Sequence, residues 1–112
     1  MAKAFTTDST EHTLNLIETY KERRMLRADA QAFTSDLLEQ AINDIEENPL
    51  QYREDSDALE LGVRLRRWID PTGKYICLFR YNQATDEAIL DIFASTRQDW
   101  LSLLYLVQIS RP

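Results

Sequence analysis

Four arginines are the side chains of this chain best suited to act on a charged target. Each lies in or just after a short apolar stretch of the second half of the sequence; they are Arg64, Arg66, Arg80 and Arg97. A guanidinium group stays protonated at any ordinary pH, so it stabilises negative charge well and accepts a proton poorly. We therefore expect the residues that bind a charged target to be among these four, and for Arg80 the alternative is a structural salt bridge to an acidic residue of a helix.

Groups that could remove a proton or hold a metal are few. His12, the only histidine, falls in the first turn of an expected helix, where we expect a surface residue. Asp91 is either a lone base or the ion-pair partner of a neighbouring arginine. Neither a metal-ligand spacing nor a glycine-rich phosphate loop nor a nucleophile elbow occurs. We therefore expect no catalytic residue, no metal and no cofactor.

Length and composition indicate one globular domain over residues 1–112. The chain is 44% hydrophobic and has one cysteine, Cys77, so its core must form without a disulfide. No apolar run approaches the length of a membrane span. These features predict a cytoplasmic protein that does not contact a membrane.

Charge is distributed unevenly along the chain, whose net charge is −6. Residues 1–60 hold 6 Lys/Arg and 14 Asp/Glu, a net −8, whereas residues 61–112 hold 7 and 5, a net +2. An acidic first half repels phosphate, so an anion would have to approach the second half. We do not expect the chain alone to bind nucleic acid directly.

Residues 62–93 predict three consecutive antiparallel strands. Alternation of apolar and polar residues indicates strands at Val63–Ile69 and Tyr75–Asn82, and β-branched and aromatic residues indicate a third at Ile89–Phe93. The sequence Asp70-Pro71-Thr72-Gly73 is typical of a type I turn. Pairing outward from this turn places Leu65 opposite Leu78 and Arg66 opposite Cys77.

The expected sheet has two apolar faces. We expect the core face to carry Val63, Leu65, Ile69, Ile76, Leu78, Leu90 and Ile92. The other face carries Arg64, Arg66, Trp68, Tyr75, Cys77, Phe79 and, by the same alternation, Ile89, Asp91 and Phe93. A bulge would exchange the faces of one strand. We expect Trp68, Tyr75, Phe79, Phe93 and Trp100 to bind a partner, unless the tail Trp100–Val107 covers this face itself.

The first half of the chain predicts a short strand at Lys3–Thr7 and two helices, Ser9–Met25 and Asp29–Glu47. The second helix has a continuous apolar stripe and ends at Asn48-Pro49. An antiparallel helical hairpin packed on the core face follows, with residues 50–61 as a surface loop. The fold class is α+β with three or four antiparallel strands, ending in an apolar C-terminal helix or tail.

The order strand, helix, helix and three antiparallel strands resembles the RelE/ParE family of toxins from bacterial toxin–antitoxin modules. The resemblance rests on Asn48-Pro49, on Gly62-Val63-Arg64, on the middle strand Tyr75–Tyr81, and on Ile89–Ile92 followed by Thr96–Trp100. It spans the chain from about Phe5 to Trp100 and consists of hydrophobic spacing and arginine positions.

The resemblance implies a type II toxin that a cognate antitoxin protein neutralises. Arg64 and Arg66 match the first basic pair of the RNA-cleaving RelE-like branch, and Arg97 matches the arginine after the last strand. Tyr75 and Ile76 stand where cleaving members place another arginine, which favours the ParE-like branch and growth inhibition through DNA gyrase. The alternatives are a ribosome-dependent mRNA endoribonuclease and a non-toxic binding module on the same fold.

Overall fold

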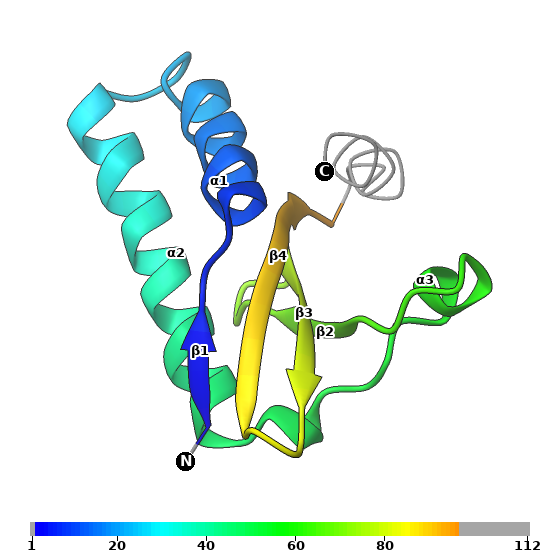
Figure 1. The fold of residues 1–112 in the computed structure, drawn as a ribbon. Helices are drawn as coiled ribbons and strands as arrows, with labels where there is room; N and C mark the ends of the chain where they lie inside the picture. The colour runs from blue at the N-terminus through cyan, green and yellow to red at the C-terminus, as the bar shows by residue number, and fades with distance from the viewer. Residues whose placement is uncertain (1, 97–112) are drawn as a thin grey trace.

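The computed structural model describes residues 2–96, which form a four-stranded sheet with a helical hairpin on one side and a short helix on the other (Figure 1). The elements are β1 (Lys3–Phe5), α1 (Asp8–Lys21), α2 (Arg27–Glu47), the 3₁₀ helix η1 (Pro49–Gln51), α3 (Ser56–Glu60), β2 (Arg66–Ile69), β3 (Tyr75–Asn82) and β4 (Glu87–Ser95). The strand order is β1-β4-β3-β2. The α+β class is confirmed, but β1 runs parallel to β4, so the sheet is mixed. The predicted C-terminal helix or tail lies outside the described residues.

The two long helices form where periodicity predicted them. Thr7 caps α1 and makes a reciprocal capping box with Thr10. The helix ends at Lys21, four residues before the predicted end, and Tyr20 in its last turn is 60% exposed. The predicted stripe of α2 is confirmed, and its fully or nearly buried members are Ala30, Leu37, Ala41 and Ile45.

The turn between β2 and β3 has two more residues in its loop than we predicted, Gly73 and Lys74. The amide of Gly73 donates to the carbonyl of Asp70 at 2.9 Å, and the amide of Asp70 donates to the carbonyl of Tyr75 at 3.0 Å, so Lys74 also belongs to the loop. Burial alone would raise the pKa of Asp70, but hydrogen bonds from Thr72, Tyr75 and Lys74 to its carboxylate outweigh burial and lower it. This carboxylate therefore organises the loop.

The longer loop shifts the β2–β3 pairing by two residues from the predicted register. Arg66 lies opposite Phe79, and Trp68 lies opposite Cys77. Side chains alternate between faces with a period of two, so a two-residue shift leaves every side chain on its predicted face. The predicted grouping of Trp68, Cys77 and Phe79 on one face is therefore confirmed although the partners are wrong.

A β-bulge divides β4 into two parts. Leu78 pairs with Ile92 and Phe79 pairs with Leu90, which leaves Asp91 as an extra residue between them. Leu90 therefore lies with Phe79, and its predicted placement beside Ile92 is wrong. A bulge exchanges the faces of the strand beyond it, which is the physical reason for this difference.

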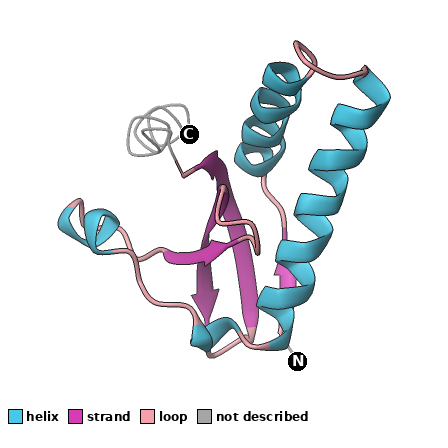
Figure 2. Ribbon diagram, turned by 180° about the vertical axis from the view of Figure 1, so that it is seen from behind, coloured by secondary structure: helices cyan, strands magenta, loops and turns pink. Residues whose placement is uncertain are grey.

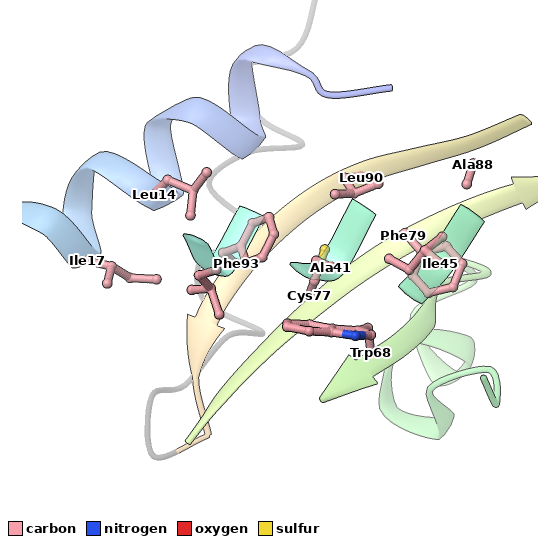
Figure 3. Close-up of a cluster of buried hydrophobic side chains, with 11 residues drawn as sticks. Leu14, Ile17, Ala41, Ile45, Trp68, Cys77, Phe79, Ala88, Leu90 and Phe93 are labelled. Carbon is pink, nitrogen blue, oxygen red and sulfur yellow. The ribbon is translucent and has the colours of Figure 1, made fainter. Parts of the chain in front are cut away.

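The helical hairpin covers the aromatic face of the sheet (Figure 3). The main buried cluster comprises Leu14, Ile17, Leu37, Ala41, Ile45, Trp68, Cys77, Phe79, Ala88, Leu90 and Phe93. We predicted that the hairpin would pack on the opposite face, and this prediction is wrong. Each buried aromatic side chain removes roughly 150–250 Å² from water, so the face with three aromatic residues gains more from being covered.

The predicted core face instead forms a second, smaller cluster on the far side of the sheet. It comprises Ala58, Leu65, Ile76, Leu78, Ile92 and Ala94, with Val63 packed against it. Ala58 comes from α3, which the side chain of Asp55 caps within the predicted surface loop. Figure 2 shows α3 and the hairpin on opposite sides of the sheet. Ile69, predicted to be in the core, is 50% exposed.

Threonines of the first helix satisfy the backbone of β4 beside the bulge. The hydroxyls of Thr7 and Thr10 donate to the carbonyl of Leu90 at 3.1 and 2.6 Å, and the amide of Phe93 donates to the hydroxyl of Thr13 at 3.0 Å. An unpaired buried backbone group would be costly. These contacts therefore fix α1 against the sheet where β1 ends.

Both outer edges of the sheet are covered over part of their length. On β1, the amide of Ala4 donates to the carboxylate of Glu46 at 2.9 Å. At β2, the amide of Asp55 donates to the carbonyl of Leu65 at 2.7 Å, and the amide of Arg67 donates to the carbonyl of Arg53 at 3.1 Å. Covered edges oppose the addition of a strand from another chain.

Replacing Phe79 with alanine tests the position of the main core. We expect Phe79→Ala to lower the free energy of unfolding by about 3–5 kcal/mol, because Phe79 is fully buried. Phe5→Ala is the matched control, since Phe5 is 44% exposed, and we expect a much smaller loss. Urea unfolding of both variants measures the difference, and equal losses would place Phe79 outside the core.

Candidate target-binding site

Two of the four predicted target-binding arginines come together in one hollow. Arg64 and Arg66 line a cavity of about 490 Å³ with Glu54, Tyr81, Asn82, Gln83 and Ala84. The hollow lies where the chain enters β2, beside the end of β3 and the turn that leads into β4. Arg80 lies elsewhere, and Arg97 lies outside the described residues.

The two arginines of the hollow differ in how firmly they are held. Arg66 Nη1 donates to the carbonyl oxygen of Tyr52 at 2.6 Å, and its backbone forms an isolated bridge with Glu54. Arg64 is exposed and forms no ion pair with any residue of 2–96. Arg66 is therefore a fixed charge, whereas Arg64 is available to an incoming group.

Tyr81 is the residue of this hollow that our sequence reasoning missed. Its hydroxyl donates to the Asp86 carboxylate at 2.6 Å. That hydrogen bond, together with desolvation and the charge of Asp86, raises the pKa of Tyr81, and Arg66 only partly opposes the rise. The phenol therefore stays protonated at neutral pH and is a poor base. The alternation along β3 that places Phe79 also places Tyr81, and this signal could have found it.

Arg80 and Asp91 form a bidentate ion pair. Arg80 Nε is 2.7 Å from Asp91 Oδ2, and Arg80 Nη2 is 3.1 Å from Asp91 Oδ1. The Asp91 side chain is only 3% exposed. The interpretation of Asp91 as the partner of a neighbouring arginine is confirmed, and the partner of Arg80 is a strand residue instead of the helix acid we considered. Arg80 therefore has a structural partner and does not join the hollow.

Three of the five residues predicted to bind a partner are part of the main core. Trp68, Phe79 and Phe93 are almost fully buried under the hairpin, so the prediction of an accessible surface there is wrong. Trp68 Nε1 donates to Asp44 Oδ2 of α2 at 3.0 Å, which ties the sheet to the helix. Tyr75 is half-buried, with its ring 5.3 Å from that of Phe33. Trp100 lies outside the described residues.

Among residues 2–96, no group of three or more His, Cys, Asp or Glu side chains could hold a metal ion. His12, the one histidine, is exposed on α1. None of the helices that the structure describes is long and apolar enough to cross a membrane.

Alanine substitution separates the structural arginine from the free one. We expect Arg80→Ala to lower the free energy of unfolding by about 1–3 kcal/mol, because Asp91 loses a bidentate partner that is itself partly exposed to solvent. Arg64→Ala is the matched control and should change stability by less than about 0.5 kcal/mol. Thermal unfolding measures both, and a destabilising Arg64→Ala would assign Arg64 a structural role.

Comparison of the sequence with known proteins leaves the family undecided. No family model matches the chain, and no curated protein matches it either. The resemblance to RelE/ParE toxins therefore stays a prediction.

Proposed function

We propose that this protein is the toxin of a bacterial type II toxin–antitoxin module, similar to the ParE-like branch of the RelE/ParE family. It inhibits growth in the cytoplasm by binding DNA gyrase, and a cognate antitoxin protein neutralises it. The order of the elements, a strand, two helices and three antiparallel strands, supports this proposal, because the resemblance rests on that order. Fold alone hosts many functions, so the site must carry the argument.

The observation that carries the proposal is the arginine pair in the hollow at the end of the sheet. Arg64 and Arg66 face the same cavity, and Arg64 is free to bind an acidic group of the target. Arginine recognises carboxylate and phosphate through two parallel hydrogen bonds. An exposed arginine beside a fixed one is therefore suited to docking on an acidic surface of gyrase.

Binding fits this hollow better than catalysis does. RNA cleavage needs a base for the ribose 2′-hydroxyl, but both arginines stay protonated and the Tyr81 hydroxyl is hydrogen-bonded to Asp86. Glu54 is the one carboxylate of the described lining. The alternative function, a ribosome-dependent endoribonuclease, would need Glu54 as its base. Glu54→Gln should leave toxicity unchanged if the protein acts by binding.

The antitoxin must use surfaces other than the aromatic face and the covered parts of the sheet edges. The helical hairpin fills the former, and Glu46 and the segment 53–55 cover the latter. An acidic segment of the antitoxin that pairs with Arg64 would block the hollow and so neutralise the toxin.

Growth after induction of the chain alone tests the proposal. We expect filamentous cells with an SOS response, and no new 5′ ends on cellular messages in primer extension. In a gyrase supercoiling assay, Arg64→Ala should raise the concentration needed for half inhibition by about tenfold or more, equivalent to about 1.4 kcal/mol of binding free energy. Arg23→Ala, which removes an exposed arginine from the far end of α1, is the matched control.

The outcomes separate the three candidate functions. Discrete new 5′ ends that disappear in Glu54→Gln would establish the endoribonuclease instead. Unchanged growth on induction would establish a non-toxic binding module. Equal effects of Arg64→Ala and Arg23→Ala on gyrase would contradict a role for the hollow.

A further inference from the structure

A second hollow lies at the opposite end of β3 from the arginine pair. It has a volume of about 330 Å³ and is lined by Tyr20, Arg24, Lys74, Tyr75, Ser95 and Thr96. The end of α1, the β2–β3 loop and the end of β4 meet there. The volume falls within the range of roughly 300–1,000 Å³ that small-molecule sites occupy.

This hollow is positively charged although the chain carries −6 overall. Arg24 and Lys74 line it, and no acidic residue of 2–96 does. Lys21 adds a third positive charge next to it, with Nζ 5.4 Å from the centre of the Tyr75 ring. The arginine hollow, in contrast, includes Glu54.

Three acids of residues 2–96 lie close in sequence to this hollow and each has contacts of its own. Asp70 accepts hydrogen bonds from the backbone amides of Lys74 and Tyr75 at 3.0 and 2.8 Å. Glu18 accepts a hydrogen bond from the hydroxyl of Thr34 at 3.0 Å, and Glu22 lies 3.8 Å from the guanidinium of Arg27. The two cations of the lining, Arg24 and Lys74, come from separate segments and can hold one phosphate group between them.

Aromatic surface lies beside the two cations. Tyr75 is fixed, because Phe33 packs edge-on against its ring and Lys21 lies over it. Tyr20 is 60% exposed, so its ring has an open surface. Every nucleobase has a flat aromatic face, so any base can stack on such a ring. A planar base next to a phosphate would satisfy both features of the hollow.

We propose that this hollow binds a nucleotide, with the phosphate on Arg24 and Lys74 and the base stacked on Tyr20. The proposal is independent of gyrase inhibition. An acidic peptide would use the two cations but would leave Tyr20 without a stacking partner. The negative net charge of the chain opposes binding along a long nucleic acid. A single nucleotide needs only the two cations of the lining, Arg24 and Lys74.

Calorimetric titration of the full chain with ATP tests the proposal, with inorganic tripolyphosphate as the probe that lacks a base. We expect ATP to bind at least fivefold more tightly than tripolyphosphate. Arg24→Ala and Lys74→Ala should each weaken both probes about tenfold. Tyr20→Leu should weaken ATP alone, and Arg64→Ala, in the other hollow, should weaken neither. All four residues are exposed, so the variants should fold, and their melting temperatures check this.

A six-nucleotide single-stranded RNA distinguishes a free nucleotide from a strand end. Tighter binding of the RNA would identify a strand end as the source. In that case the slope of log K against log salt concentration should become shallower by about 0.7 for each cation removed. Tighter binding of ATP would identify a free nucleotide. Absence of ATP and RNA binding at millimolar concentration would overturn the proposal, as would a poly-glutamate peptide that binds while ATP does not.

Discussion

The bulge at Asp91 is the constraint on which the rest of the structure depends. One extra residue in β4 lets Leu90 and Phe93 both face the helical hairpin, while Ile92 faces the second cluster. The threonines of α1 bind the backbone on either side of the bulge, so the helix and the bulge stabilise each other. A sheet with apolar side chains on both faces can in this way support a core on each side.

Local features of the fold could be predicted from the sequence, whereas the choice between two faces could not. Alternation predicted the strands, and apolar spacing predicted the α2 stripe. The side-chain grouping on β2 and β3 was also predicted, because a two-residue error in register preserves it. Both faces are apolar, however, and no glycine or proline marks the bulge at Asp91. Alternation alone therefore could not decide which face the hairpin covers; we assigned it to the wrong face and left the aromatic one for a partner.

The candidate site was predicted only where charge and spacing were both informative. Arg64 and Arg66 meet as expected, because alternation places them on one face. Arg80 alternates with Phe79 and Tyr81 along β3, so it lies on the other face of the sheet, where it pairs with Asp91. The second hollow could not be predicted, since Tyr20, Lys74 and Thr96 come from three elements that only the tertiary fold brings together. Positive charge therefore gathers at both ends of β3. Glu54 lines the arginine hollow, whereas no acidic residue of 2–96 lines the second one.

Reaction of Cys77 with a thiol reagent tests most directly whether the hairpin covers the aromatic face. Cys77 is the only cysteine, it is fully buried beneath α2, and burial together with the charge of Asp91 raises its pKa well above the ordinary value. We expect the native chain to react at least about a hundredfold more slowly than the urea-unfolded chain, because reaction needs an opening of the core. Reaction of the native chain at the rate of the unfolded one would show an open face and would contradict this account.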